Sequence, residues 1–339
     1  MKLRTRVVAL PLRHRFTIAH GSFAERENFF VELEHAGERG FGESSAVSYY
    51  GVDAHAMAAR TEVLRPRLED WDGADPESLW ASLLPELDDD RFTLCAIDEA
   101  AWDLWGKLRG VRLWEAWGLS LATCPPSDYT IGIDDLDTMV RKLEEFPDFP
   151  VYKIKLGTDQ DLEIVTELRR HTAAVFRVDA NTGWTAEQTI EFAPKLAELG
   201  VEFVEQPLPP DDEAGIARVF ADSVLPIVAD ESCLVEADVD RCAGRFHGIN
   251  VKLTKAGGIT PARRMIGRAR ELGLKTMVGC MTETTVGISA IGQLAPMLDW
   301  VDMDGALLLA EDVADGVRVR DGRIEYPDTS GTGVTWTRP

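Results

Sequence analysis

The sequence predicts an α/β fold built on a (β/α)8-type TIM barrel, with a smaller α+β domain ahead of it. From residue 129 on, short apolar segments alternate with amphipathic ones, which is the pattern of parallel strands joined by helices. Eight such apolar segments occur by residue 304, and eight strands can close a barrel. A chain of 339 residues is long enough for this barrel and a second domain.

The predicted N-terminal domain, residues 1–122, opens with an antiparallel meander. Its three strands are predicted over residues 2–12, 28–34 and 39–43. We expect the first strand to stop at Pro11. The intervening segments 16–22 and 44–51 are rich in Gly, Ser and Thr, so we expect them to be loops that line a site.

Helical segments follow in the same domain, over residues 53–68, 76–87 and 92–108. The third has the clearest periodicity, because apolar residues recur at helical spacing and a glycine follows: Ile97, Ala101, Leu104, Leu108 and then Gly110. Helices that cover one face of a meander make an α+β domain.

The predicted barrel domain, residues 123–316, begins at the turn-rich connector 123–128. Its strands are predicted over residues 129–132, 151–156, 175–180, 201–205, 227–230, 248–253, 275–278 and 300–304. Helices between them include residues 136–146, 161–171, 186–199 and 261–272. The tail, residues 317–339, is expected to form a hairpin around Asp321-Gly322 and to pack back on the first domain.

The composition opposes several classes of partner. A formal net charge of −22 is unfavourable for binding nucleic acid or an anionic membrane. No segment approaches the roughly 20 apolar residues of a membrane span. The N-terminus lacks the pattern of a signal peptide, so we expect a cytoplasmic protein. The five cysteines form no C-x-x-C pair, which argues against a disulfide framework or a zinc site.

Three carboxylates end three successive predicted strands of the barrel: Asp179, Glu205 and Asp230. Each gap between them fits one helix, so the strands would be adjacent and the carboxylates would converge. Such a cluster repels itself unless a hard divalent cation, most often Mg²⁺, binds to its oxygens. Acids also cap helices after strands, but their recurrence in three successive units favours the metal site.

Lysines flank this acidic cluster on the predicted barrel. Lys153 and Lys155 share one face of the second strand, because side chains alternate along a strand. Two adjacent ammonium groups would lower the pKa of at least one of them, giving a base at neutral pH. Lys252, on the opposite sixth strand, could act on the other side of a substrate carbon. The alternative, a solvated lysine face, requires an edge strand, which a barrel lacks.

Opposed lysines beside a metal site suit a 1,1-proton transfer. A proton α to a carboxylate is only weakly acidic, because its removal creates a dianionic enediolate. A metal ion that binds the carboxylate oxygens stabilises that charge. The acids and the lysines therefore support one chemical interpretation.

Four further segments accompany these residues: 96–104 (AIDEAAWDL), 178–184 (VDANTGW), 204–207 (VEQP) and 229–232 (ADES). Together with Lys-x-Lys, the three acids and Lys252, they resemble the muconate-lactonizing subgroup of the enolase superfamily over nearly the whole chain. The resemblance implies a modified, enolase-like barrel with an N-terminal capping domain. It also implies one Mg²⁺ bound by Asp179, Glu205 and Asp230, an acid/base pair of Lys155 and Lys252, and supporting roles beside the metal for Asn181 and Glu231.

The eighth predicted strand distinguishes activities within this subgroup. Asp302 and Asp304 lie on one of its faces at the barrel mouth, where they would attract a cation and repel a dianionic substrate. In dipeptide epimerases a similar Asp-x-Asp motif holds the substrate's α-ammonium, and the segment 279–283 (GCMTE) is also similar to that family. The alternative for the two acids is helix capping.

We therefore expect a Mg²⁺-dependent dipeptide epimerase that acts on the α-carbon of the C-terminal residue. The alternatives are an N-acylamino acid racemase or o-succinylbenzoate synthase of the same superfamily, and a barrel that binds metal and peptide without catalysis. Other expected substrate contacts are Lys153, Thr17, Ile18, His20, Ser22, Tyr49, Tyr50, Cys280 and Met281. No arginine in 16–22 could pair with an acidic side chain, although Arg26 follows, so the preferred dipeptide stays open. The oligomeric state also stays open, with a homo-oligomer allowed.

Overall fold

The N-terminal strands form the predicted antiparallel meander, but two of them are much longer than predicted. The computed structural model describes residues 1–18 and 21–338. β1 (Lys2–Ile18) continues through Pro11, and β2 (Gly21–His35) begins in the segment expected to be a loop. Their register shifts between Pro11 and Phe16, so a bulge accommodates the proline instead of ending the strand. β3 (Glu38–Ser45) completes the sheet.

Helices cover this meander as predicted: α1 (Ala54–Asp70) and α3 (Arg91–Arg109) pack on the sheet, and α2 (Pro76–Leu87) packs on α3. An aspartate caps the N-terminus of each. α3 lies directly on β3, where a Cβ on Gly42 would come within 2.0 Å of a backbone oxygen of the helix. Glycine is therefore required for this close packing of helix and strand. A short helix, α4 (Leu113–Ala116), leads toward the barrel.

The barrel strands all occur where they were predicted. They are β4 (Tyr129–Ile131), β5 (Val151–Lys155), β6 (Val175–Asp179), β7 (Val201–Glu205), β8 (Ile227–Ala229), β9 (Gly248–Val251), β10 (Lys275–Val278) and β11 (Trp300–Val301). They are parallel and follow one another in chain order. Ser127, just before β4, forms a β-bridge with Val301 of β11, which brings the first and last strands of the sheet together. This is the modified TIM barrel that the sequence predicts.

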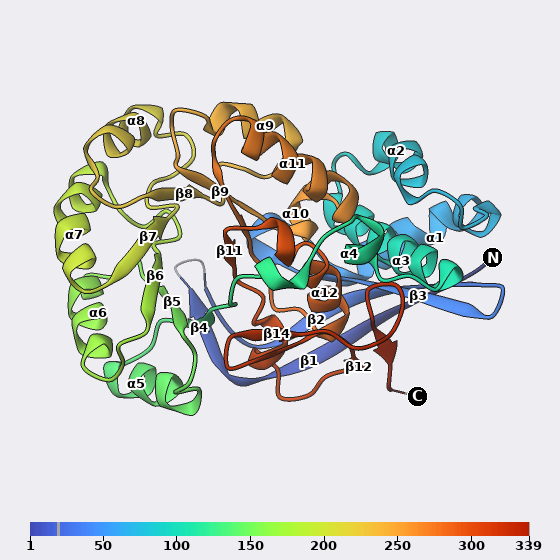
Figure 1. Cartoon of the computed structure of the whole chain (residues 1–339), viewed down its shortest axis with the longest axis horizontal. Helices are drawn as coiled ribbons and strands as arrows, with labels where there is room; N and C mark the ends of the chain where they lie inside the picture. The colour runs from blue at the N-terminus through green and yellow to red at the C-terminus, as the bar shows by residue number, and fades with distance from the viewer. Residues whose placement is uncertain (19–20, 339) are drawn as a thin grey trace.

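Helices lie outside these strands (Figure 1). They are α5 (Leu136–Glu145), α6 (Asp161–Arg169), α7 (Ala186–Glu198), α8 (Glu213–Asp222), α9 (Glu236–Cys242), α10 (Leu253–Ala256), α11 (Ile259–Glu271) and α12 (Thr285–Gly292). The gap between Glu205 and Asp230 was expected to hold one helix, and α8 lies there. α9, α10 and α12 are absent from the sequence-based prediction. α9 is too short for a clear period, and α12 is buried on every side, so its sequence shows no polar face. None of the described helices is long and apolar enough to cross a membrane.

The tail returns to the meander and carries the predicted hairpin. β13 (Arg318–Arg320) and β14 (Arg323–Glu325) pair across Asp321-Gly322, and β15 (Thr335–Trp336) pairs with β12 (Ala314–Asp315). The Trp336 ring packs against Phe30 and Phe41 of the capping sheet. The exact boundaries at residues 122 and 316 stay a prediction.

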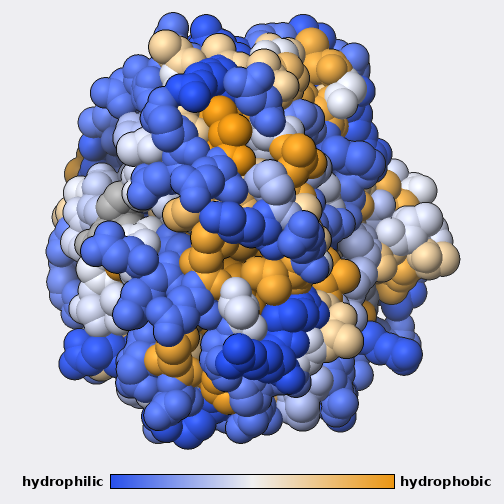
Figure 2. Space-filling model, turned by 90° about the vertical axis from the view of Figure 1, so that its left-hand side faces the viewer, coloured by the Kyte–Doolittle hydropathy of each residue, from blue (hydrophilic) through white to orange (hydrophobic). Residues whose placement is uncertain are grey.

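The face of the molecule shown in Figure 2 is mostly polar, as expected for a chain with many charged residues. Seen from the left of Figure 1, it is largely hydrophilic, with hydrophobic residues gathered in a central band (Figure 2). Charged residues make up 28% of the sequence.

Candidate active site

The register of the parallel strands places Lys155, Asp179 and Glu205 side by side. Lys155 is opposite Asp179, and Asp179 is opposite Glu205. Asp230 directly follows β8, at the same end of the barrel. The three carboxylates are buried, and each offers an oxygen within 4.8 Å of the others. Hard oxygen donors at this separation fit a divalent cation such as Mg²⁺.

Polar side chains that the sequence analysis missed support these carboxylates. Asn250 donates from Nδ2 to Glu205 Oε1 at 2.8 Å, and Gln206 Oε1 accepts from the Asp230 backbone N–H at 2.9 Å. Gln206 and Asn181 both have positive φ, at 31° and 42°, although neither is glycine. Such backbone conformations are uncommon and cluster at functional sites. Strand alternation could have indicated Asn250, two residues before Lys252. Gln206 belongs to the segment 204–207 (VEQP) that carries the resemblance, but the sequence analysis gave it no role.

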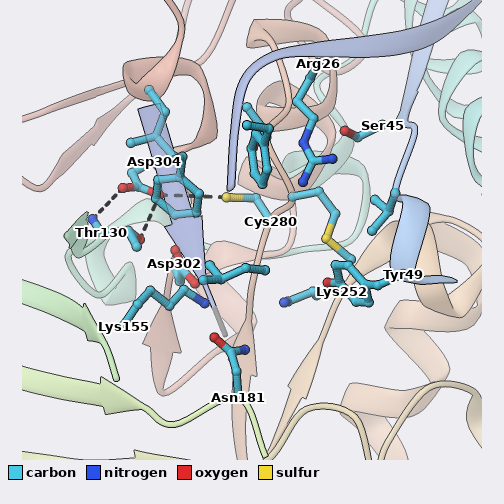
Figure 3. Close-up of a pocket in the computed structure, with 17 residues that line it drawn as sticks. Arg26, Ser45, Tyr49, Thr130, Lys155, Asn181, Lys252, Cys280, Asp302 and Asp304 are labelled. Atoms are coloured by element: carbon cyan, nitrogen blue, oxygen red, sulfur yellow. Dashed lines mark hydrogen bonds between the residues drawn. The ribbon is translucent and has the colours of Figure 1, made fainter. Parts of the chain in front are cut away.

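Two lysines enter the pocket from opposite sides (Figure 3). Lys155 Nζ lies 2.6 Å from Asp179 Oδ2, and Lys252 Nζ lies 2.9 Å from Asp230 Oδ2. Lys255 also donates to Asp230, through its carboxylate and its backbone oxygen. The geometry places an ammonium group on each side of the pocket, which is the arrangement expected from the strand positions.

Lys153 lies on the face of β5 that it was predicted to share with Lys155, and both lysines reach Asp179. Lys153 is 1% exposed and is not among the residues that line the pocket, so its contact with substrate stays a prediction. Its Nζ lies 2.8 Å from Glu205 Oε2 and 2.7 Å from Asp302 Oδ2. Lys153 therefore links the acids of the central strands to the acids after β11.

Nearby carboxylates raise the pKa values of Lys153 and Lys252. Burial lowers the pKa of Lys153, but Asp302, Glu205 and Asp179 outweigh burial and hold it well above its usual value. Burial also lowers the pKa of Lys252, and Asp230 raises it above the usual range. For Lys153 this is opposite to the effect expected from a neighbouring ammonium group alone, because three carboxylates lie within 3.5 Å of its Nζ.

Asp302 and Asp304 lie together at the mouth of the barrel, after β11. Asp304 Oδ2 accepts from the Thr130 backbone N–H at 2.6 Å, and Cys280 Sγ lies 3.9 Å from Asp304 Oδ1. Burial and the charge of Asp302 raise the pKa of Asp304 to about 7. Burial also acts to raise the pKa of Asp302, but Lys153 and Lys155 hold it below its usual value. Asp302 Oδ1 is buried and has no hydrogen-bond partner among the described residues, so it can accept from a ligand.

The pocket above these groups has one wall from the barrel and one from the capping domain. Its lining includes Phe16, Ile18, Phe23, Arg26, Ser45, Val47, Tyr49, Thr130, Lys155, Asn181, Lys252, Cys280, Met281, Asp302 and Asp304. Ile18, Tyr49, Cys280 and Met281 are thus placed as the sequence analysis expected. His20 lies outside the described residues.

Three other predicted substrate contacts lie outside this pocket. Thr17 bonds to Ser22 through their hydroxyl groups, 2.9 Å apart and exposed, because the alternation of β1 turns Phe16 and Ile18 inward instead. Tyr50 lines a neighbouring cavity and packs against the Phe92 ring. Substrate contacts of Thr17, Ser22 and Tyr50 therefore stay predictions. Glu231 also lies outside the lining, and burial and Asp230 raise its pKa to about 8.

A second group of buried carboxyls lies between the capping domain and the barrel. It consists of Glu43 on β3, Glu99 on α3 and Glu283 after β10. Glu43 accepts from Asn28 Nδ2 at 2.6 Å and from Thr284 Oγ1 at 2.6 Å. Burial raises the pKa of Glu43 to about 7, that of Glu283 to about 8, and that of Glu99 well above its usual value. The folded protein therefore holds protons here that an unfolded chain would release.

This cluster predicts that stability falls as the pH rises from about 5 to about 8. A carboxyl whose pKa is raised on folding contributes its full stability below its unfolded pKa and loses it as the pH rises through its folded pKa. The slope is about 1.4 kcal/mol per pH unit for each such proton. We expect Glu283→Gln to flatten this slope in denaturant titrations, and the exposed control Glu198→Gln to leave it unchanged. Equal slopes in the wild type and Glu283→Gln would contradict the prediction.

Comparison with known proteins identifies the fold family. The family described as Enolase C-terminal domain-like matches residues 136–339. The chain belongs to the enolase superfamily. Within this superfamily, it is 52% identical to an L-Ala-D/L-amino acid epimerase of Flavobacterium johnsoniae, over 99% of both chains. A second L-Ala-D/L-amino acid epimerase, from a Maribacter species, is 51% identical over 99% of both chains.

A solved structure of the enolase superfamily agrees over the whole chain. The dipeptide epimerase of Enterococcus faecalis V583, complexed with Mg and the dipeptide L-Leu-L-Tyr, has a TM-score of 0.93 and 28% identity, with 98% of each chain covered. The similarity extends across both the capping sheet and the barrel.

Proposed function

We propose that this protein is a Mg²⁺-dependent dipeptide epimerase that inverts the α-carbon of the C-terminal residue by 1,1-proton transfer. The observation that carries the proposal is the pair of opposed lysines, Lys155 and Lys252, beside the acidic cluster in one pocket. The names of the relatives and the Mg and dipeptide in the E. faecalis structure support the substrate class.

In this proposal, Asp179, Glu205 and Asp230 hold the Mg²⁺ ion. When bound, the ion would supply positive charge that stabilises negative charge on the substrate's carboxylate oxygens and offsets the charge of the Asp230 carboxylate, which raises the pKa of Lys252. Asn250 fixes the Glu205 carboxylate through its hydrogen bond. Asn181 and Glu231 are proposed to support the ligands from neighbouring positions.

The proton transfer itself is assigned to the two lysines. One lysine, as a neutral amine, removes the α-proton from one face, and the other, as an ammonium, donates a proton to the opposite face. In the reverse direction the roles exchange. Cys280 and Met281 line the pocket and restrict the space around the substrate.

Asp302 and Asp304 are proposed to bind the α-ammonium of the dipeptide. The unpartnered, buried Oδ1 of Asp302 supports this role, because a cation would supply its missing hydrogen bond. N-acylamino acids and succinylbenzoate precursors have no free ammonium group. They would leave these acids facing a neutral or anionic ligand, which disfavours both alternatives.

The proposal is tested with a library of L,L-dipeptides incubated in D₂O with Mg²⁺. We expect the C-terminal residue to gain one deuteron at its α-carbon, as measured by mass spectrometry, only when Mg²⁺ and a free α-amino group are present. Absence of exchange in every dipeptide, with Mg²⁺ binding measured by calorimetry, would reject the dipeptide assignment.

The ammonium site gives a separate prediction. We expect the double variant Asp302→Asn, Asp304→Asn to lose at least about 10-fold in kcat/KM for dipeptides, mainly through KM, because hydrogen bonds to a charged group are lost. The measurement is steady-state kinetics with free and N-acetylated forms of one dipeptide. If the variant discriminates between the two forms as strongly as the wild type does, the two acids do not bind the ammonium.

A further inference from the structure

A thiol and two carboxylates converge at the mouth of the barrel, beside the acidic cluster. Cys280 follows β10, and Asp302 and Asp304 follow β11, the neighbouring strand. Each of the three offers one atom within 4.8 Å of the others. The sulfur of Cys280 points toward Asp304, with Sγ 3.9 Å from Oδ1 (Figure 3). All three side chains line the pocket, so a small cation can reach them.

Both carboxylates are held in place through one oxygen, which leaves the other oxygen for a ligand. Lys153 Nζ lies 2.7 Å from Asp302 Oδ2, and the Thr130 backbone N–H donates to Asp304 Oδ2 at 2.6 Å. The Asp302 side chain is 5% exposed, and its Oδ1 has no hydrogen-bond partner among the described residues. Hydrogen bonds of this kind orient carboxylates as metal ligands, and a buried oxygen without a partner can be satisfied by a cation.

The chemistry of these three groups differs from that of the acidic cluster. Asp179, Glu205 and Asp230 offer only hard oxygen ligands, which suit Mg²⁺. A thiolate favours softer ions, and Zn²⁺ binds sulfur and carboxylate oxygen together while keeping a fourth position for water. The expectation against a zinc site rested on the spacing of cysteines along the chain. A site that takes one cysteine and two acids from neighbouring strands does not need that spacing.

We propose that Cys280, Asp302 and Asp304 form a second metal site, for a thiophilic divalent cation such as Zn²⁺. The cation bonds to the sulfur and to one oxygen of each acid, and the thiol proton leaves to solvent as the metal–sulfur bond forms, without any change of oxidation state. The site itself goes beyond the proposed function. Its consequence rests on that function: the same two acids are proposed to bind the dipeptide ammonium, so Zn²⁺ and the substrate exclude each other.

The test uses Co²⁺ as a probe, because a bond between Co²⁺ and a thiolate absorbs in the near ultraviolet by charge transfer. The reduced full-length protein is titrated with Co²⁺ in the presence of excess Mg²⁺. We expect a charge-transfer band that reaches its maximum at one thiolate-bound ion and is bleached by Zn²⁺, which binds more tightly than Co²⁺. Any Co²⁺ in the acidic cluster has oxygen ligands and adds nothing to this band.

Variants assign the band to the proposed ligands. Cys280→Ser should remove it, and Asp304→Asn should weaken Co²⁺ binding at least about 10-fold, as expected when a metal ligand is replaced. The matched control is Cys124→Ser, since Cys124 is also a half-buried free cysteine, and this variant should keep the band. Mg²⁺ binding, measured by calorimetry, shows that each variant is folded. A band that survives in Cys280→Ser, or a folded wild type without a band, would overturn the inference.

Competition with a dipeptide tests whether the site is shared with the substrate. L-Ala-L-Leu should reduce the band, and its N-acetyl form, which lacks the ammonium group, should not. A full band at a concentration of L-Ala-L-Leu that saturates the protein in calorimetry would overturn the competition. A band in a protein that exchanges no dipeptide would support the metal site and reject the proposed function alone.

Discussion

Replacing Lys155 or Lys252 with alanine is expected to lower epimerisation by at least about 10³-fold, since a positioned acid or base contributes about 10²- to 10⁴-fold and each direction needs both. Each lysine bonds to a different carboxylate and reaches the pocket from a different side. The remaining lysine can therefore still remove a proton and return one on its own face. Each single variant should exchange the α-proton of only one epimer without inverting it, and the double variant should exchange neither.

The measurement is α-deuteron uptake in D₂O, followed separately from each epimer of one dipeptide. A matched control is Lys195→Ala, because Lys195 is exposed on α7 and, among the residues that the structure describes, pairs only with Glu191. This variant should retain the wild-type rate. Exchange in the double variant at the wild-type rate would remove both lysines from the mechanism, and inversion by a single variant would show that one lysine serves both faces.

Loss of the metal site is expected to have an effect of similar size. Chelation of Mg²⁺ should abolish exchange, and Glu205→Gln should weaken Mg²⁺ binding by more than about 100-fold, since replacing even the supporting groups of metal ligands costs 10- to 100-fold in affinity. Binding is measured by calorimetry and exchange by mass spectrometry.

The melting temperature without Mg²⁺ separates this effect from misfolding. Burial and the charge of Asp179 raise the pKa of Glu205, so the carboxylate is under repulsion and a neutral amide of the same shape should not lower the melting temperature. The exposed control Glu198→Gln should bind Mg²⁺ normally. Unchanged Mg²⁺ affinity in Glu205→Gln would contradict the assignment.

The barrel could be predicted from the sequence because its strands are short, apolar and separated by helices of regular length. The same reasoning failed for β1, because a proline usually ends a strand and only the bulge between Pro11 and Phe16 allows this one to continue. It also failed for α12, whose residues are buried on all sides and therefore lack a period.

The residues of the candidate site could also be predicted only in part from the sequence. Asp179, Glu205 and Asp230 were predictable because each ends a strand, and strand ends converge. Gln206 was not, because its role depends on a positive φ and on a hydrogen bond to the next strand. The raised pKa of Lys153 was not predictable, since it depends on which charges lie closest in the folded barrel, and the sequence does not give those distances.

β1 and β2 form a long arm that carries residues lining the pocket but none of the proposed catalytic or metal-binding residues. Substrate specificity can therefore evolve separately from the chemistry. The lysines and carboxylates lie on barrel strands or just after them, whereas Phe16, Ile18, Phe23 and Arg26 lie on the arm. A backbone hydrogen bond of 2.9 Å, from Ile133 to Thr17, ties the arm to the barrel without using a side chain. Substitutions at the four inward positions can therefore accumulate without disturbing the arm's attachment or the reacting groups. Proteins with this fold can therefore change their specificity for dipeptides by single substitutions in the arm.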